Sequence, residues 1–548
     1  MTRRYDAVVV GAGHNGLIAA AYLARAGRSV CVLERDAIPG GAVSTVERFP
    51  GYRVDRGSSA HIMIRHTPIL DELDLYRHGL RYADCDPWAF APAETDDDEP
   101  IVFHRDLAAT CASIERSCGR ADADSYARFV AQWAPRARAT MAAFGHEPTP
   151  TRFAATFASS GLRTPTARES LLDRRIGALS SMSQDMMNSG DALLDRWFNS
   201  ERLKAALAWF GAQSGPPTDL PGTAPMVGFA ALMHDIPPGR AIGGSGALTT
   251  ALCAALAADG GKLVTDSPAT ALRRRGDDWE VVDTSGTVTT ARHVIAACHI
   301  GATLDLLAAG GHRADQIDRW RRAIVVGNGI GIAVRLGTTA LPAYRNTPSG
   351  LPAHGMHSGL GLLTTERAHL RRAHAASAVG ELPARPVALP MGFSALDPSI
   401  APAGRHLVNV WAQWHPYRFA DGGSWADRAR TAADGVIAEI DRYAPGFAST
   451  IEHCYIQTPA DLESELALPA GNIMHVEMTI DQMFGWRPHP DLAGRSVPGA
   501  HGLVLAGAST HPGGGVTGTS GRLAARAILH RTSKRRGLGT TARTIWHD

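Results

Sequence analysis

The sequence predicts an α/β fold in which a discontinuous Rossmann-like domain is interleaved with a mixed α+β domain. A strand, a glycine turn, a helix and a second strand follow one another within residues 5–34. Alternating helices and strands return after residue 243, and residues 502–530 contain a last strand, a glycine-rich loop and a helix. Because 548 residues exceed what a single core usually holds, we expect two units whose pieces return to one another in space.

The two units are expected to alternate along the chain. The first comprises residues 1–85, 240–300 and 495–532, and the second comprises residues 86–239 and 301–494. Within the second unit, Ala- and Arg-rich periodic stretches predict helices, and apolar runs predict strands. The helices are expected over 123–143 and 189–210, and the strands over 331–335, 387–393, 407–414 and 473–478.

The first glycine turn has the pattern of a phosphate site. Gly11, Gly13 and Gly16 fit G-x-G-x-x-G, which combines a tight turn, close approach of backbone to a pyrophosphate and close helix packing. The helix that follows places its N-terminal N–H groups against the phosphates. Glu34 ends the second strand, where a carboxylate can accept hydrogen bonds from a ribose 2′-OH. We therefore expect a dinucleotide at this end of the sheet.

Two further glycine-rich segments favour FAD over NAD. The sequence after Glu34 continues through Pro39-Gly40-Gly41-Ala42, an extension similar to that of flavoproteins with a glutathione reductase-like domain. Near the end of the chain, a strand, a glycine loop and a helix would form a second site for the flavin side. The expected FAD contacts are Gly11, Gly13, His14, Asn15, Gly16, Glu34, Arg35, Gly40, Gly41, Ala42, Ala269, Gly507, Ala508, Gly518 and Thr519.

Several motifs resemble one family over nearly the whole chain. GAGHNGL at 11–17, WFNSERLK at 197–204, GGSGAL at 243–248, Arg487-Pro488 and the segment 510–514 resemble phytoene desaturase-related flavoproteins, and within them CrtO-type β-carotene ketolases. The resemblance implies non-covalent FAD, an apolar polyene substrate and peripheral contact with a membrane. Residues 57–60 and 327–331 depart from the ketolase pattern.

Three residues are candidates for catalysis near the flavin. His61 matches a histidine of the ketolases, and His475 and Glu477 lie where family members carry similar residues. Each could act as a general base or orient the substrate. The alternative is that each is a hydrogen-bonded structural residue at the interface between the domains. The loop 327–331 precedes a strand rather than a helix, so we interpret it as structural and not as a second nucleotide site.

The expected reaction is transfer of a substrate C–H hydrogen as hydride to the flavin, which oxygen or a quinone then reoxidises. The product would be a C=C bond or, after oxygen insertion, a ketone. One alternative keeps FAD but takes a polycyclic or amine intermediate of specialised metabolism. A second alternative is a non-catalytic FAD-binding interaction protein.

Composition excludes several other classes. The net charge of +2 gives no case for nucleic acid, and no histidine and carboxylate cluster has metal-ligand spacing. Seven scattered cysteines, no visible secretion signal and no apolar stretch of spanning length predict a cytoplasmic protein with free thiols. The basic tail 533–548 is either solvated or a membrane contact. Three lysines among abundant arginines are typical of a GC-rich bacterial genome.

Overall fold

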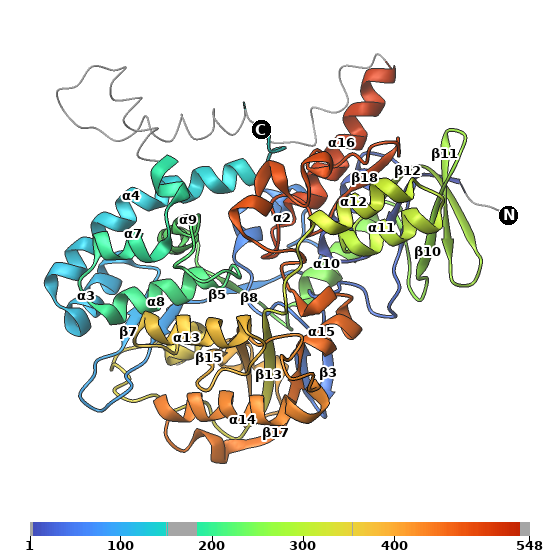
Figure 1. The fold of residues 1–548 in the computed structure, drawn as a ribbon. Helices are drawn as coiled ribbons and strands as arrows, with labels where there is room; N and C mark the ends of the chain where they lie inside the picture. Colours follow the sequence, from blue (N-terminus) through green and yellow to red (C-terminus); the bar gives the residue numbers. More distant parts are fainter. Residues whose placement is uncertain (1–3, 150, 152–182, 353, 537–548) are drawn as a thin grey trace, which may run out of the picture.

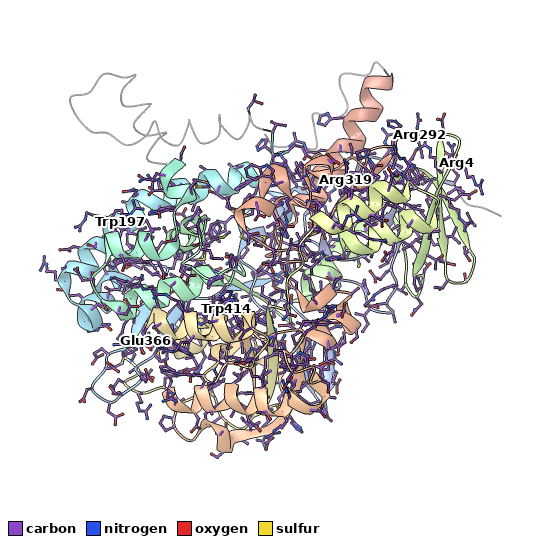
Figure 2. The ribbon with its side chains drawn as sticks, in the orientation of Figure 1. Arg4, Trp197, Arg292, Arg319, Glu366 and Trp414 are labelled. Carbon is purple, nitrogen blue, oxygen red and sulfur yellow. The ribbon has the colours of Figure 1, made fainter. Side chains whose placement is uncertain are left out.

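The computed structural model describes residues 4–149, 151, 183–352 and 354–536. Figure 1 shows strands β10 to β12 and helices α11, α12 and α16 on the right, helices α3, α4, α7 and α8 on the left, and a second sheet with β13, β15 and β17 at the bottom. Figure 2 shows Arg4 and Arg292 at the right edge of the molecule and Trp197 near the left edge. The predicted tail at 533–548 lies largely outside the described residues, and none of its side chains is described.

The first unit is built on a seven-stranded sheet. Its strand order is β10-β11-β12-β1-β2-β9, with β18 paired to β12. Strands β9, β2, β1, β12 and β18 pair with one another in parallel. Strand β11 pairs antiparallel with both β12 and β10. The bounds are β1 (Arg4–Val10), β2 (Val30–Leu33), β9 (Lys262–Val264), β10 (Ala269–Arg275), β11 (Asp278–Asp283), β12 (Val288–Ala296) and β18 (Leu503–Leu505). The Rossmann-like prediction is thereby confirmed.

Helices cover both faces of this sheet, which explains why residues 7–10 of β1 are all apolar and buried. Ala7 and Val9 pack with three helices on one face, whereas Val8 and Val10 pack with two helices on the other. The first face carries α1 (His14–Arg25), α10 (Gly246–Ala258) and α16 (Thr519–Arg536), and the second carries α11 (Ile300–Ala309) and α12 (Ala314–Ala323). Residues 301–323 therefore pack with the first unit, so the predicted boundary at residue 300 is too early. The apolar faces of α11 and α12 decide this placement.

The second unit contains a helical layer with one break that the sequence prediction missed. The predicted helix over 189–210 is two helices, because the Ser200 hydroxyl accepts from the N–H of Leu203 and starts a new helix. The buried Asp122 carboxylate accepts from the N–H groups of Asn199 and Ser200 at 2.8 and 2.7 Å and fixes the break. The layer comprises α3 (Leu107–Cys118), α4 (Arg120–Phe144), α7 (Gly190–Trp197), α8 (Glu201–Ala212), α9 (Ala224–Gly228) and α13 (Arg367–Ala378).

A four-stranded antiparallel sheet, in the order β15-β16-β13-β17, completes the second unit. Its strands are β15 (Val387–Met391), β16 (His406–Gln413), β13 (Gly331–Thr338) and β17 (Ile451–Gln457), and α14 (Trp425–Tyr443) packs on one face. Because Gly331 opens β13 and no helix follows, the structural interpretation of 327–331 is confirmed. Smaller elements are β3 (Thr45–Phe49), β4 (Tyr52–Asp55), α2 (Ile69–Glu72), β5 (Tyr82–Asp84), β6 (Ala89–Ala91), β7 (Ile101–Phe103), β8 (Gly239–Ala241), β14 (Leu360–Gly361) and α15 (Pro459–Leu466).

The predicted strand over 473–478 is wrong. This segment is irregular, and His475 has a left-handed backbone with φ of +70°. Its carbonyl groups bond to a buried arginine side chain instead of to a neighbouring strand. The segment is therefore a loop between the two units.

Candidate functional site

The turn between β1 and α1 leaves open space in front of a helix N-terminus. Gly11 has φ of +100°, and a Cβ on Gly16 would lie 2.1 Å from the carbonyl oxygen of Gly11, so only glycine fits at both positions. A Cβ on Gly13 would meet nothing within 4 Å. Gly13 is the N-cap of α1 and provides no side-chain capping bond. The N–H groups of the first turn therefore face a space that an anion can fill.

The second glycine turn borders the same space. The N–H of Gly40 donates to the carbonyl of Ala12 at 2.9 Å, and Gly13 and Gly40 form a parallel bridge. Gly40 has φ of +108°, and a Cβ there would lie 2.5 Å from the carbonyl oxygen of Val43. Gly41 comes next, with its ideal Cβ position 3.9 Å from the Cα of Gly13. Two turns that are distant in the sequence thus enclose one backbone-lined site.

Glu34 lies at the end of β2, as predicted for a residue that binds ribose. Its Oε2 accepts from the N–H of Ala12 at 2.6 Å and its Oε1 accepts from the N–H of Asp36 at 3.1 Å. Burial raises the pKa of this carboxyl, while the two backbone N–H groups oppose the shift. Since a carboxylate has about four acceptor positions, two remain for hydroxyl groups.

Three other predicted FAD contacts, Arg35, Ala269 and Ala42, have their contacts outside the turn between β1 and α1. The Arg35 guanidinium reaches the carbonyl of Glu465 at 3.0 Å, away from the glycine turns. Ala269 starts β10 and pairs with Asp283. It comes two residues after Ser267, whose N–H donates to the carbonyl of Glu34 at 2.8 Å. Ala42 lines the cavity described below.

The C-terminal loop meets the first turn at the start of α16. The side-chain Oδ1 of Asn15 accepts from the N–H of Gly521 at 3.3 Å, which joins the N-termini of α1 and α16. Gly507 has φ of +91°, and its ideal Cβ would lie 3.1 Å from the carbonyl oxygen of Ala297. Gly518, which precedes Thr519, packs so closely that a Cβ would lie 2.6 Å from Ile18. The turn before α1 and the loop before α16 thus lie side by side.

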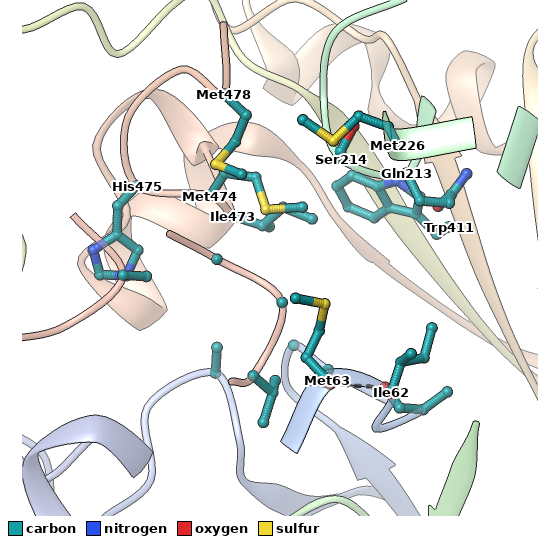
Figure 3. A pocket seen from close by; sticks show the side chains of 18 of the residues that line it. Ile62, Met63, Gln213, Ser214, Met226, Trp411, Ile473, Met474, His475 and Met478 are labelled. Carbon is teal, nitrogen blue, oxygen red and sulfur yellow. Dashed lines mark hydrogen bonds between the residues drawn. The ribbon is translucent and has the colours of Figure 1, made fainter. Parts of the chain in front are cut away.

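A cavity of about 370 Å³ opens beside this loop and separates the two units. His14, residues 57–60 and residues 512–516 line it from the first unit, and β13, β15 and β16 line it from the second. Seven of the thirteen methionines face it: Met63, Met186, Met226, Met391, Met474, Met478 and Met483. Figure 3 shows Met226, Met474 and Met478 across the cavity from Met63. Flexible thioether side chains adapt their shape to apolar ligands.

Of the three catalytic candidates, His475 is the one that lines the cavity (Figure 3). Its Nδ1 lies 3.1 Å from the hydroxyl of Ser509, and its carbonyl oxygen lies 2.9 Å from Nε2 of His299. Burial lowers the pKa of His475 well below its usual value, and burial lowers that of His14 to about 4. Both rings are therefore neutral at pH 7.

His61 and Glu477 lie outside the cavity lining. Both ring nitrogens of the buried His61 are engaged, with the hydroxyl of Tyr82 at 2.6 Å and that of Ser245 at 2.8 Å. The Glu477 side chain packs against Gly327, where any Cβ would overlap its Oε1. Burial raises the pKa of Glu477 to about 7. Their catalytic roles stay predictions.

Arg487 is the residue that sequence reasoning missed. Its buried guanidinium donates to the carbonyl oxygens of Met474 at 2.6 Å, Glu477 at 2.9 Å and Ala508 at 2.8 Å, and more weakly to two others. It therefore joins the loop that carries His475 to the C-terminal glycine loop. Burial lowers the pKa of Arg487 to about 9. The Arg487-Pro488 motif was the available signal, but it indicated no role.

Comparisons with known proteins agree with this geometry. Residues 16–316 match the model of the family described as flavin containing amine oxidoreductase. The chain is 31% identical to mouse pyridine nucleotide-disulfide oxidoreductase domain-containing protein 2, over 96% of this chain and 93% of that one. It is 28% identical to phytoene dehydrogenase of Streptomyces griseus, over 95% and 94%.

A similar fold occurs in solved structures. Wild-type putrescine oxidase bound to putrescine superposes with a TM-score of 0.58 at 14% identity, over 97% of this chain and 100% of that one. An oxidoreductase from Methanosarcina mazei gives a TM-score of 0.57 at 15% identity, over 96% and 100%. At such identities the likeness concerns the fold alone.

Proposed function

Because the chain belongs to the family of flavin-containing amine oxidoreductases, we propose that it uses FAD to oxidise an apolar substrate, of carotenoid or polyene type, in the methionine-lined cavity. The observation that carries this proposal is the position of the cavity. It lies next to the glycine loops that would hold a flavin, and apolar side chains, including seven methionines and five aromatic residues, supply most of its lining. Apolar cavities with few polar groups are typical of small-molecule sites.

The cofactor is FAD, and the site fits it. The two glycine turns and the N-terminus of α1 would hold the pyrophosphate, and Glu34 would accept from the ribose hydroxyl groups. The loop over 507–518 would face the flavin. Bound FAD supplies a two-electron acceptor for hydride, whereas orientation and exclusion of water are the work of this chain's residues.

The charge of the cavity distinguishes between the substrates considered. Among the described residues that line it, no aspartate or glutamate is present. A cationic amine would therefore be buried without a counter-charge. Burial of an unpaired ion costs on the order of several kcal/mol. This observation favours the apolar substrate over the amine alternative.

His475 is proposed to orient the substrate or the flavin edge, because it is neutral and lines the cavity. Glu477 and His61 are proposed to support it. Glu477 belongs to the same loop, and its carbonyl oxygen accepts from Arg487. His61 fixes residues 57–60 through Tyr82 and Ser245. Oxygen or a quinone is proposed as the final electron acceptor.

A cytoplasmic location is proposed, with peripheral contact to a membrane at the helical side of the cavity. Met187, Leu220 and Trp486 are large apolar side chains that are 57%, 39% and 52% exposed. They are neighbours in sequence of the lining residues Met186 and Phe484. An apolar substrate taken from a membrane would enter near such side chains. No helix in the described part of the chain is long and apolar enough to cross a bilayer.

The proposal is tested on the purified holoprotein. We expect a yellow protein that releases one FAD per chain on denaturation. Under anaerobic conditions, a polyene in detergent should bleach the flavin band, whereas putrescine should not; the polyenes tested are phytoene, lycopene, β-carotene and a carotenoid carboxylic acid. Bleaching by putrescine alone would favour the amine alternative. A flavin that neither these compounds nor extracts of the source cells reduce would favour a non-catalytic protein.

A further inference from the structure

Arg335 lies on the cavity face of the four-stranded sheet. Side chains of a strand alternate between its faces, and residues directly opposite on neighbouring strands share a face. Val334 and Leu336 pack in the core beneath α14, whereas Ala333 and Arg335 line the cavity. Trp411, which pairs with Ala333 on β16, lines it too. The strand register thus directs the Arg335 side chain toward the cavity.

The Arg335 guanidinium has hydrogen-bonding capacity that the protein does not use. The residue is 2% exposed, and its Nε is buried without a partner among the described residues. No carboxylate in the described part of the chain lies within the 4.0 Å that defines an ion pair. Burial lowers the pKa of Arg335 to about 10, so the group remains cationic at neutral pH. Arg487, by contrast, is equally buried but donates to five carbonyl groups.

The nearby carboxylate of Asp55 is already engaged. It accepts from Arg240, from the hydroxyl of Thr45 at 2.8 Å and from the N–H of Ser245 at 2.8 Å. Its charge acts on Arg335 from a distance and raises the pKa of that group against the effect of burial. Arg335 therefore faces the cavity with its own donors available. Buried guanidinium groups of this kind bind planar carboxylates with two parallel hydrogen bonds.

We infer that the substrate has an apolar body and one carboxylate, and that Arg335 binds this carboxylate. Arg335 is the single charged side chain among the described residues that line the cavity. One cation balances one negative charge, whereas a phosphate dianion would leave a charge uncompensated in an apolar surrounding. The methionines at the remaining walls would contact the apolar body.

This inference rests on the proposed function, because it takes the cavity as the substrate site. It narrows the class of substrate to a lipid-like or isoprenoid monocarboxylic acid. The test uses decanoate, 1-decanol and decyl phosphate as probes, titrated calorimetrically into the FAD-loaded full-length protein at pH 8. Decanoate should bind at least roughly tenfold more tightly than 1-decanol, because hydrogen bonds to charged groups are strong. Decyl phosphate should bind more weakly than decanoate.

Arg335→Gln should abolish the preference for decanoate and leave the affinity for 1-decanol unchanged. Arg335→Lys should keep part of the preference for decanoate. Arg322→Gln, at an exposed position of α12, is the matched control and should behave as wild type. FAD content reports whether each variant is folded. Equal affinities of the wild type for acid and alcohol, tighter binding of decyl phosphate, or a preference that survives in a folded Arg335→Gln variant would overturn the inference. Arg335-dependent binding without bleaching by any apolar compound would instead contradict the proposed oxidation and leave the carboxylate site standing.

Discussion

At the scale of single residues, Gly13 is the position where a side chain would do most harm to cofactor binding. A valine there meets no protein atom, since the ideal Cβ has nothing within 4 Å, so the apoprotein should fold normally. The side chain would instead occupy the space in front of the α1 N-terminus. We expect Gly13→Val to lose FAD.

The measurement is the ratio of flavin to protein absorbance after purification and reconstitution. Gly494→Val is a suitable control, because Gly494 is exposed and its Cβ would also meet nothing. Glu34→Ala should weaken FAD more gently, through lost charge-assisted hydrogen bonds that are worth about 1.5–3 kcal/mol. Full FAD occupancy in Gly13→Val would show that the pyrophosphate lies elsewhere.

Glu477 should give the stability of the protein a characteristic dependence on pH. Burial raises its pKa from 4.5 to about 7 in the folded protein. The folded protein therefore favours the protonated carboxyl. The contribution of this group to the free energy of unfolding is complete below about pH 4.5 and is lost as the pH rises through about 7. Glu477→Gln keeps the shape and removes the charge. The melting temperature of this variant, relative to wild type, should increase from pH 5 to pH 8.

Differential scanning fluorimetry across that range provides the check. Asp277→Asn, at a fully exposed side chain, should show a constant difference from wild type. A Glu477→Gln variant whose relative melting temperature stays flat or falls with pH would mean that the carboxylate is ionised in the folded protein.

At the scale of elements, a buried ion pair joins the last helix, α16, to α2. The Arg522 guanidinium of α16 donates to both carboxylate oxygens of Glu72 at 2.8 and 2.6 Å, and the Tyr22 hydroxyl of α1 donates to the same carboxylate. Removing one partner leaves a buried charge without compensation. We expect Arg522→Met to destabilise the protein by about 3–5 kcal/mol.

The double variant Glu72→Gln with Arg522→Met should recover much of this loss, because no charge then remains. Chemical denaturation of the three variants and the wild type forms a double-mutant cycle. A double variant as unstable as the sum of the two single variants would show that the pair is not coupled.

Elements that depend on local sequence were predictable, and those that depend on distant partners were not. The two glycine turns and Glu34 follow from backbone geometry within a few residues of each position. The segment 473–478 has an apolar pattern that is typical of a strand. Its carbonyl oxygens accept hydrogen bonds from the Arg487 side chain instead of from a neighbouring strand, and the segment is a loop. The break at Ser200 depends on Asp122, which lies 78 positions away in the sequence.

At the scale of the whole molecule, the arrangement of the two units predicts the source of electrons. A chain that reduces its flavin with NADH or NADPH is expected to carry a second βαβ unit with its own glycine loop. In the described residues, the other glycine-rich candidate, 327–331, opens β13 instead of a helix. We therefore expect the apolar substrate itself to reduce the flavin. NADPH under anaerobic conditions should leave the flavin band unchanged over minutes.

Stopped-flow absorbance separates the outcomes, with dithionite as the positive control for reducibility. Rapid bleaching by NADPH would identify a nicotinamide donor and would move the function toward a monooxygenase. The cavity itself was beyond sequence reasoning, because Met63, Met226, Met391 and Met478 come together only through the folded arrangement of both units.

The joining of Asn15 to Gly521 has a consequence for biosynthesis. A ribosome makes the glycine turn at the start of α1 long before the helix that completes the binding site, because Asn15 and Gly521 lie 506 positions apart in the sequence. During that interval the apolar faces of α1 and β1 lack α16, their final neighbour. Nascent chains should therefore depend on chaperones, and flavin should enter only after α16 has been made and has packed against α1 and β1. Truncation at residue 500 should yield aggregated, colourless protein even when riboflavin is plentiful.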